Sequence, residues 1–111
     1  MRPIRVTVDS ATASRPIPMD HYRDPFNVGV GVALSAGASL TYTVQHTFDD
    51  VFAKTFDPAT ATWFNNTSLS SKTTSSDGNY SFPVTAIRVN VTVWASGSAT
   101  MTLIQAGMSG E

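Results

Sequence analysis

Cysteine is absent from the 111 residues of this chain. Its absence excludes disulfide bonds, thiolate nucleophiles and every cysteine-containing zinc or iron–sulfur site. The fold must therefore be held together by packing and hydrogen bonds. A chain of this length can bury one hydrophobic core but not two, so we predict a single domain spanning residues 1–111.

Charged residues are also scarce. They make up 14% of the chain against a usual ~25%, and seven Lys and Arg residues are balanced by eight Asp and Glu residues. The arginines are scattered and form no basic cluster. Because nucleic-acid binding depends on grouped basic residues that neutralise phosphates, this composition argues against a nucleic-acid partner.

Long apolar runs are missing as well. No run approaches the ~18 residues that would cross a bilayer, and MRPIRVTV at the start of the sequence is not followed by the apolar core of a signal peptide. We therefore expect a soluble protein that is synthesised in the cytoplasm and has no membrane partner.

Alternation of apolar and polar residues is the strongest positive signal, because a period of two is typical of half-buried β-strands. The alternating segments are 4–8, 28–34, 40–45, 87–94 and 99–105. The turn-like sequences SAGAS and ASGSA predict that the second and third of these segments form one antiparallel hairpin and the last two another. In the segment 28–34, glycine and alanine leave one face bare, so we expect a neighbouring element or a partner chain to lie across it.

The strand pattern predicts an all-β fold. No segment of ten or more residues has a convincing helical period, and the strands number roughly six to eight. A single sheet would leave one apolar face in water, whereas two packed sheets bury it. We predict an antiparallel two-sheet β-sandwich that is jelly-roll-like.

The N-terminal residues 1–20 form a possible extended strand or arm, since Pro3, Pro16 and Pro18 disfavour a helix. One hypothesis is that Ile4, Val6 and Val8 form an edge strand that another chain completes. The alternative is an ordinary edge strand of the chain's own sandwich.

The middle section, residues 46–83, loses the alternation and is predicted to consist mainly of loops. DDVFAK could form one helical turn, and FDPATATWF predicts an Asp-Pro turn followed by a short aromatic strand. The polar tract 67–79 ends in the turn dipeptide Asp77-Gly78, and we expect it to be exposed and mobile.

His46 is the residue that most resembles a catalytic group, with Asp49 or Asp50 as an orienting partner. However, the sequence contains no G-x-S-x-G or comparable nucleophile motif. The alternation places His46 on the same face as the apolar residues before it, which favours a structural, partly buried histidine. We predict no enzymatic activity and no cofactor. We also predict no metal site, because His21 and His46 lie in different segments without a ligand-spacing motif.

Five aromatic residues are concentrated in seventeen positions of the loop-rich section: Phe48, Phe52, Phe56, Trp63 and Phe64. One interpretation is a satellite cluster that pins a long loop to the sandwich, with the aspartates serving as turn and cap residues. The other is an exposed aromatic platform for a sugar or a protein. The sequence favours pinning, with one or two of the five left exposed.

Four sequence segments resemble those of a known family: HTFDD, TFDPATATWF, DGNYSFPVTAIRVNVT and SGSATMTLIQ. Across about 22–105, the chain resembles the small decoration proteins, also called staple or cement proteins, of short-tailed bacteriophage capsids of the epsilon-fifteen type. The resemblance implies a non-enzymatic, jelly-roll-like domain on the outer surface of the virion. It further implies a homodimer that bridges neighbouring capsomers of an HK97-like coat protein and stabilises the shell against the pressure of packaged DNA.

The family supplies no catalytic residues and does not identify the residues that face the capsid. From their chemistry alone, we expect the partner-contact residues to be Ile4, Val6, Val8, Phe52, Phe56, Trp63 and Phe64. The alternative function is a carbohydrate-binding β-sandwich on a phage surface, in which Trp63 or Tyr80 stacks on a sugar ring.

Overall fold

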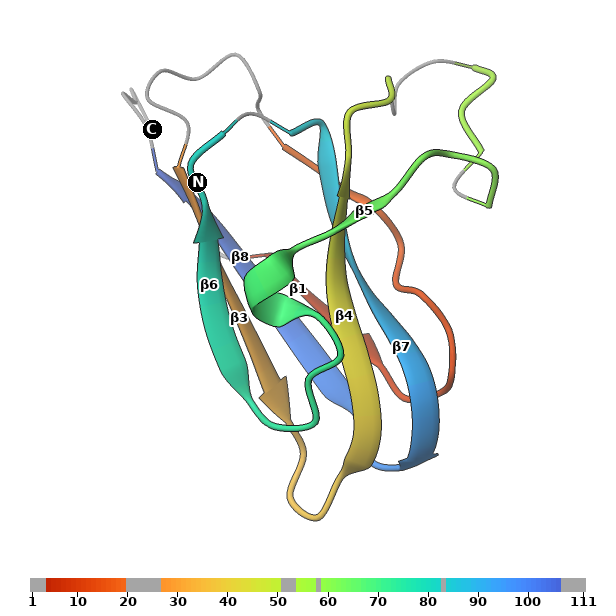
Figure 1. Cartoon of the computed structure of the whole chain (residues 1–111), viewed down its shortest axis with the longest axis vertical. Helices are drawn as coiled ribbons and strands as arrows, with labels where there is room; N and C mark the ends of the chain where they lie inside the picture. Colours follow the sequence, from red (N-terminus) through yellow and green to blue (C-terminus); the bar gives the residue numbers. More distant parts are fainter. Residues whose placement is uncertain (1–3, 20–26, 51–53, 58, 83, 107–111) are drawn as a thin grey trace.

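A computed structural model describes residues 4–19, 27–50, 54–57, 59–82 and 84–106. Within them lie eight β-strands and one short 3-10 helix (Figure 1). The elements are β1 (Ile4–Val8), β2 (Ile17–Pro18), β3 (Asn27–Leu34), β4 (Ser39–Thr47), β5 (Phe64–Asn65), η1 (Thr67–Leu69), β6 (Ser76–Tyr80), β7 (Ala86–Ser96) and β8 (Ala99–Ala106).

The strands form two four-stranded sheets with the orders β1-β8-β3-β6 and β2-β7-β4-β5. Every pairing between these strands is antiparallel. The two sheets pack face to face (Figure 1), and their strand order is that of a jelly roll. The predicted all-β, two-sheet sandwich is therefore confirmed.

The two predicted hairpins are wrong in their pairing. β3 and β4 belong to different sheets, and so do β7 and β8, so each turn carries the chain from one sheet to the other. This crossing lets consecutive strands bury their apolar faces against each other across the core. The two turns pack together: the Ser35 amide donates to the Ser98 carbonyl at 3.0 Å. A Cβ atom built on Gly97, which has a φ of 86°, would lie 2.5 Å from the Cβ atom of Ala38.

The polar tract 67–79 is a second correction, because it is not an exposed loop throughout. It contains η1 and most of β6, and Leu69 is fully buried. The dipeptide Asp77-Gly78, which predicted a turn, lies inside β6. Gly78 faces inward, where an added Cβ would be 3.2 Å from the Cδ1 atom of Leu69. This glycine therefore makes room for a core leucine.

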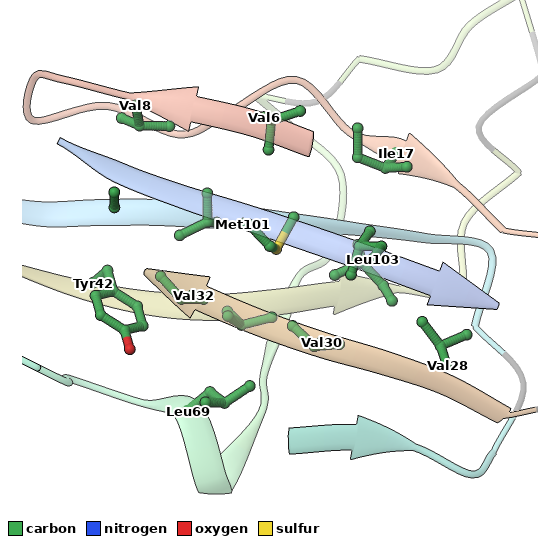
Figure 2. Packing of buried hydrophobic residues seen from close by; sticks show 14 of the residues in the cluster. Val6, Val8, Ile17, Val28, Val30, Val32, Tyr42, Leu69, Met101 and Leu103 are labelled. Carbon is green, nitrogen blue, oxygen red and sulfur yellow. The ribbon is translucent and has the colours of Figure 1, made fainter. Parts of the chain in front are cut away.

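The core consists of the inward-facing residues of both sheets, and Figure 2 shows how they interdigitate. Val28, Val30 and Val32 of β3 alternate with exposed or half-exposed residues, as their period of two predicted. Tyr42 of β4 is fully buried, and its hydroxyl donates to the Thr74 carbonyl at 2.7 Å. Packing of valines and large side chains thus stabilises the fold without a covalent cross-link.

The described part of the N-terminal segment, residues 4–19, belongs to the chain's own sandwich. β1 pairs along its length with β8, and its inward residues Val6 and Val8 are 8% and 4% exposed. Beyond β1, the segment 12–18 runs along β7 through backbone hydrogen bonds and the short β2. The alternative of an ordinary edge strand is therefore what the structure shows. The expectation that the side chains of Val6 and Val8 contact a partner is corrected here, because both side chains are buried in the core.

Candidate functional site

A cluster of five aromatic rings occupies one end of the sandwich, where the edge strands β5 and β6 approach each other. Its members are His46 from β4, Phe48 beyond it, Phe64 from β5, Tyr80 from β6 and Phe82 beyond it. The ring centroids of His46 lie 5.0–6.0 Å from those of the other four. Such distances are typical of aromatic packing. The cluster therefore joins both sheets at this end.

The cluster has a buried floor and an exposed rim. His46 and Tyr80 are 6% and 0% exposed, whereas Phe48, Phe64 and Phe82 are 53%, 47% and 45% exposed. We call these three phenylalanines the aromatic patch. Their rings lie 5.7 Å (Phe48 to Phe64) and 6.4 Å (Phe48 to Phe82) apart. The patch is thus a continuous apolar surface supported from below by a fixed polar pair.

The floor is a hydrogen-bonded pair, in which the Nδ1 atom of His46 lies 2.9 Å from the Tyr80 hydroxyl. Burial lowers the pKa of His46 from its ordinary value, because the charged imidazolium loses hydration there. Burial also raises the pKa of Tyr80 to about 12, against a smaller lowering by a hydrogen bond with Asn66. Both groups are therefore neutral at pH 7. The prediction that His46 is buried on the inward face of its strand is confirmed.

Asp49 anchors the loop that follows β4. Its carboxylate accepts a hydrogen bond from the Thr62 amide at 2.9 Å, and its carbonyl accepts one from the Thr85 hydroxyl at 2.6 Å. The Thr47 hydroxyl donates to the Thr62 carbonyl at 2.8 Å. Asp49 thus connects the two ends of the loop by hydrogen bonding. The hydrogen-bond partner of His46 is Tyr80. This geometry matches the interpretation of the aspartates as loop-shaping residues.

The Asp-Pro turn and the short aromatic strand predicted from FDPATATWF correspond to observed features. The Asp57 carboxylate accepts a hydrogen bond from the Ala59 amide at 2.9 Å, and its carbonyl accepts one from the Ala61 amide at 2.8 Å. β5 then follows at Phe64. The helical turn predicted for DDVFAK falls largely on residues 51–53, which lie outside the described residues.

Trp63 lies beside the cluster but is not a free platform. The guanidinium carbon of Arg88 sits 4.0 Å from the centroid of its ring, at cation–π distance. Arg88 is itself held by a 2.9 Å hydrogen bond from its Nε to the Oε1 atom of Gln45. Tyr80 is fully buried. The expectation that Tyr80 stacks on a sugar is therefore wrong, and one face of Trp63 is covered.

The expected partner-contact residues have different positions in the structure. Phe64 is in the aromatic patch, Ile4 is half-buried, and Phe56 is half-buried beside a surface hollow of about 330 Å³ that Asp49 and Asp57 also line. Phe52 lies outside the described residues. Of the four described members of the predicted five-membered aromatic group, Phe48 and Phe64 enter the observed cluster.

Sequence reasoning missed Tyr80 and Phe82 as members of the cluster. The signal was available in their spacing of two, which places both on one side of an extended chain, as it does for His46 and Phe48. The polar tract before them predicts an exposed loop, which gives no reason to expect a strand that ends at Tyr80.

The described part of the chain has no group of three or more histidine, aspartate or glutamate residues close enough to hold a metal ion. In the same residues, no helix has the length and apolar character needed to cross a bilayer. His21, which was considered as a ligand, lies outside the described residues.

No family model matches this sequence. A search of curated proteins also finds no match. Among solved structures, the fold is similar to a chain of Bacillus endospore appendages, which are described as a novel family of disulfide-linked pili. The sequence identity is 17% and the TM-score is 0.48, over 97% of this chain and 88% of that chain.

Proposed function

We propose that this protein is a structural virion component that binds the outside of a bacteriophage capsid and bridges neighbouring coat-protein capsomers. The partner is a major capsid protein of HK97-like fold, as the sequence resemblance implies. The observation that carries the proposal is the aromatic patch of Phe48, Phe64 and Phe82, which are about half exposed at one end of the sandwich. Such a surface is suited to docking on another protein, because aromatic residues are enriched in interface cores.

The size of the patch supports a weak contact at each site. About half of three phenylalanine side chains amounts to roughly 300 Å² of apolar surface. At ~25 cal/mol per Å², its burial contributes about 7 kcal/mol before the costs of association. Repeated copies on one shell then act together, since each bound copy stabilises only the assembled arrangement of capsomers.

The buried pair beneath the patch supports the same function. His46 and Tyr80 are neutral at pH 7 and hydrogen-bonded to each other, so they hold the patch in place without presenting charge to a partner. A jelly roll is also common among virion proteins, although this is an analogy of fold only.

The test is co-sedimentation of the purified chain with expanded shells made from the coat protein encoded in the same genome and lacking any decoration protein. We expect saturable binding at a fixed ratio to coat protein and a higher temperature of shell rupture. Phe48→Ser with Phe82→Ser should weaken binding by about 100-fold, because two of the three aromatic anchors are lost.

The matched control is Val93→Ser. Val93 is 61% exposed and lies on β7 opposite Thr41, toward the other end of the sandwich. Its replacement removes a comparable exposed apolar side chain and should leave binding unchanged. If the unmodified chain fails to bind correctly expanded shells, the proposal is wrong. If the variant with Phe48→Ser and Phe82→Ser binds as well as the Val93→Ser control, the aromatic patch is not the contact.

Carbohydrate binding stays as the alternative prediction and has a separate test. A glycan binder should show saturable sugar affinity that depends on Trp63, measured by titration calorimetry with Trp63→Ala as the comparison. A capsid staple should show none.

A further inference from the structure

A row of polar side chains crosses the outer face of the β2-β7-β4-β5 sheet. Arg88 on β7 is in register with Gln45 on β4, which is in register with Asn65 on the edge strand β5. The Nε atom of Arg88 donates to the Oε1 atom of Gln45 at 2.9 Å. The Nε2 atom of Gln45 donates in turn to the Oδ1 atom of Asn65 at 2.9 Å. Neighbouring strands therefore hold these side chains in one hydrogen-bonded row.

The direction of the hydrogen bonds leaves donors at both ends of the row. An arginine side chain has N–H donors and no acceptor, so the Gln45 oxygen must face Arg88 and the Gln45 nitrogen must face Asn65. The groups that remain are the Nη groups of Arg88 and the Nδ2 group of Asn65. Within the described residues, neither has a hydrogen-bond acceptor. The row thus offers N–H groups to a ligand that accepts hydrogen bonds.

The positive charge of Arg88 has no carboxylate beside it in the described part of the chain. The other contact of the guanidinium is the ring of Trp63, 4.0 Å from its carbon atom. Arg88 is half-buried, and this burial lowers its pKa from the ordinary value. Charged groups that are taken partly out of water are usually paired, because nothing else offsets the lost hydration. An anionic ligand at Arg88 would offset that loss.

The guanidinium of Arg88 is held in place by the chain itself. Stacking on Trp63 sets the plane of the group, and the hydrogen bond to Gln45 sets its rotation within that plane. A side chain that is ordered in advance loses little conformational entropy when a ligand binds. The planar fork of arginine matches a carboxylate, which can accept two parallel hydrogen bonds from it. The geometry therefore favours a carboxylate over a neutral acceptor.

We infer that Arg88 is the centre of a carboxylate-binding site, and that an aspartate or glutamate side chain of a partner protein occupies it. A protein partner is favoured because the site borders the aromatic patch. Phe64 of that patch lies between Trp63 and Asn65 in the chain, and Phe64 and Asn65 form the edge strand β5 (Figure 1). An arginine next to aromatic residues is typical of the residues that dominate protein–protein binding.

The carboxylate site stands on its own geometry, whereas its assignment to the coat protein rests on the proposed function. The aromatic patch supplies apolar contact area, which is not directional. A hydrogen-bonded pair between Arg88 and a carboxylate adds direction, because the two planar groups must align. A chain that uses both contacts docks on its partner in one orientation.

The first experiment uses no capsids. A short end-capped peptide of glutamate residues is titrated into the isotope-labelled chain at low salt, and the NMR signals of the Arg88 Nε–H and Trp63 indole groups are followed. We expect saturable shifts with a dissociation constant on the order of 1 mM. Arg88→Gln should weaken binding by about 10-fold or more, measured at Trp63, because the charge-assisted hydrogen bonds are lost.

The matched control is Arg5→Gln, which removes the same charge from an exposed arginine on β1. It should leave the affinity within about twofold of the unmodified chain, because exposed charges at a distance are screened. An equal loss in both variants would show general charge attraction and would overturn the inference. An Arg88 signal in the unmodified chain that does not move up to ~10 mM peptide would also overturn it, whether or not Arg88→Gln folds.

A parallel titration with an oligomer of galacturonic acid separates the two sources of a carboxylate. The sugar oligomer carries carboxylates at similar density but no peptide backbone. We expect it to bind more weakly than the glutamate peptide. Tighter binding of the sugar acid at Arg88 would overturn the assignment to a protein partner.

The second experiment identifies the partner group on decorated shells. Arg88→Lys places a primary amine in the site, and a water-soluble carbodiimide joins an amine to an adjacent carboxylate. An amide bond forms, and the carbodiimide takes up the elements of water and becomes a urea. We expect a cross-link from position 88 to an aspartate or glutamate of the coat protein, located by mass spectrometry, and none from the control Arg5→Lys.

The two experiments fail in different ways. Decorated shells without a cross-link from position 88 would overturn the assignment to the coat protein. If the unmodified chain does not bind shells but the glutamate peptide binds at Arg88, the proposed function is wrong and the carboxylate site stands.

Discussion

Replacement of Leu69 by alanine, alone and together with a change at Gly78, gives the sharpest test of the packing beneath β6. Leu69 is fully buried, although it lies in a tract of serine and threonine. Loss of a buried leucine costs about 3 kcal/mol of unfolding free energy. For a domain with a total stability of about 5–15 kcal/mol, that loss is easily measured.

The effect of Gly78→Ala on the free energy of unfolding should change sign between the unmodified chain and the Leu69→Ala variant. In the unmodified chain, alanine gains about 0.5–1 kcal/mol over glycine in a strand. However, its Cβ would be 3.2 Å from the Cδ1 atom of Leu69, and overpacking of this kind costs 1–3 kcal/mol, by order of magnitude. We expect a net destabilisation of about 1 kcal/mol. With Leu69→Ala in place, the close contact is gone and the new methyl group fills part of the space, so Gly78→Ala should stabilise by about 1 kcal/mol.

The assay is urea unfolding of the four proteins, followed by tryptophan fluorescence and circular dichroism. The double-mutant cycle should give a coupling energy of about 2 kcal/mol. The transitions seen by the two probes must coincide, because a single unfolding free energy is defined only for a two-state transition. If the two changes are additive within ~0.5 kcal/mol, Leu69 does not pack on Gly78, and the assignment of this tract to the core is refuted.

Three further predictions concern the cluster and the turns. Burial lowers the pKa of His46 in the folded state. The free energy of unfolding should therefore be highest above the ordinary histidine pKa of 6.5 and should fall as the pH drops below it. His46→Gln should flatten this pH dependence in thermal melts between pH 8 and pH 5. Gly97→Ala should lower the free energy of unfolding by about 2–3 kcal/mol, because the φ of 86° and the close Ala38 contact both disfavour a side chain. Gly37 has a φ of 73° but open space around it, so Gly37→Ala should cost only about 1 kcal/mol. Urea unfolding measures both variants. Arg88→Met should alter the fluorescence maximum of Trp63 while lowering stability by no more than about 1 kcal/mol, and an unchanged spectrum would contradict the cation–π contact.

The sequence predicts the strands well where one face of each strand is buried in a continuous core. Val28, Val30 and Val32 are buried in the structure, and the same logic places β1, β4, β7 and β8. Alternation reports which face of a strand is buried, but it says nothing about which neighbour completes its hydrogen bonds. For this reason the turns were recognised correctly while both hairpin pairings were wrong.

The candidate site was only partly predictable for a related reason. His46 and Phe48 follow an alternating strand, so their position could be inferred. Tyr80 ends β6 and Phe82 lies beyond it, and the residues of β6 before Tyr80, Ser76 to Asn79, include an inward glycine and show no apolar pattern. Leu69, from outside this strand, fills the space beside the inward Gly78. A contact of this kind is tertiary and leaves no local signature.

The pairing of β1 with β8 has a consequence for the order in which the protein can fold. During synthesis, β1 to β6 emerge before β7, yet β1 and β3 both pair with β8, and β2 and β4 both pair with β7. The β2-β7-β4-β5 sheet cannot be completed until β7, which ends at Ser96, has been made, and the β1-β8-β3-β6 sheet must wait for β8, which ends at Ala106. Chains dominated by such distant pairings fold slowly, in milliseconds to seconds. In the interval, the aliphatic faces of β3 and β4 have no sheet to cover them, so the growing chain depends on the rapid arrival of its last two strands to avoid aggregation.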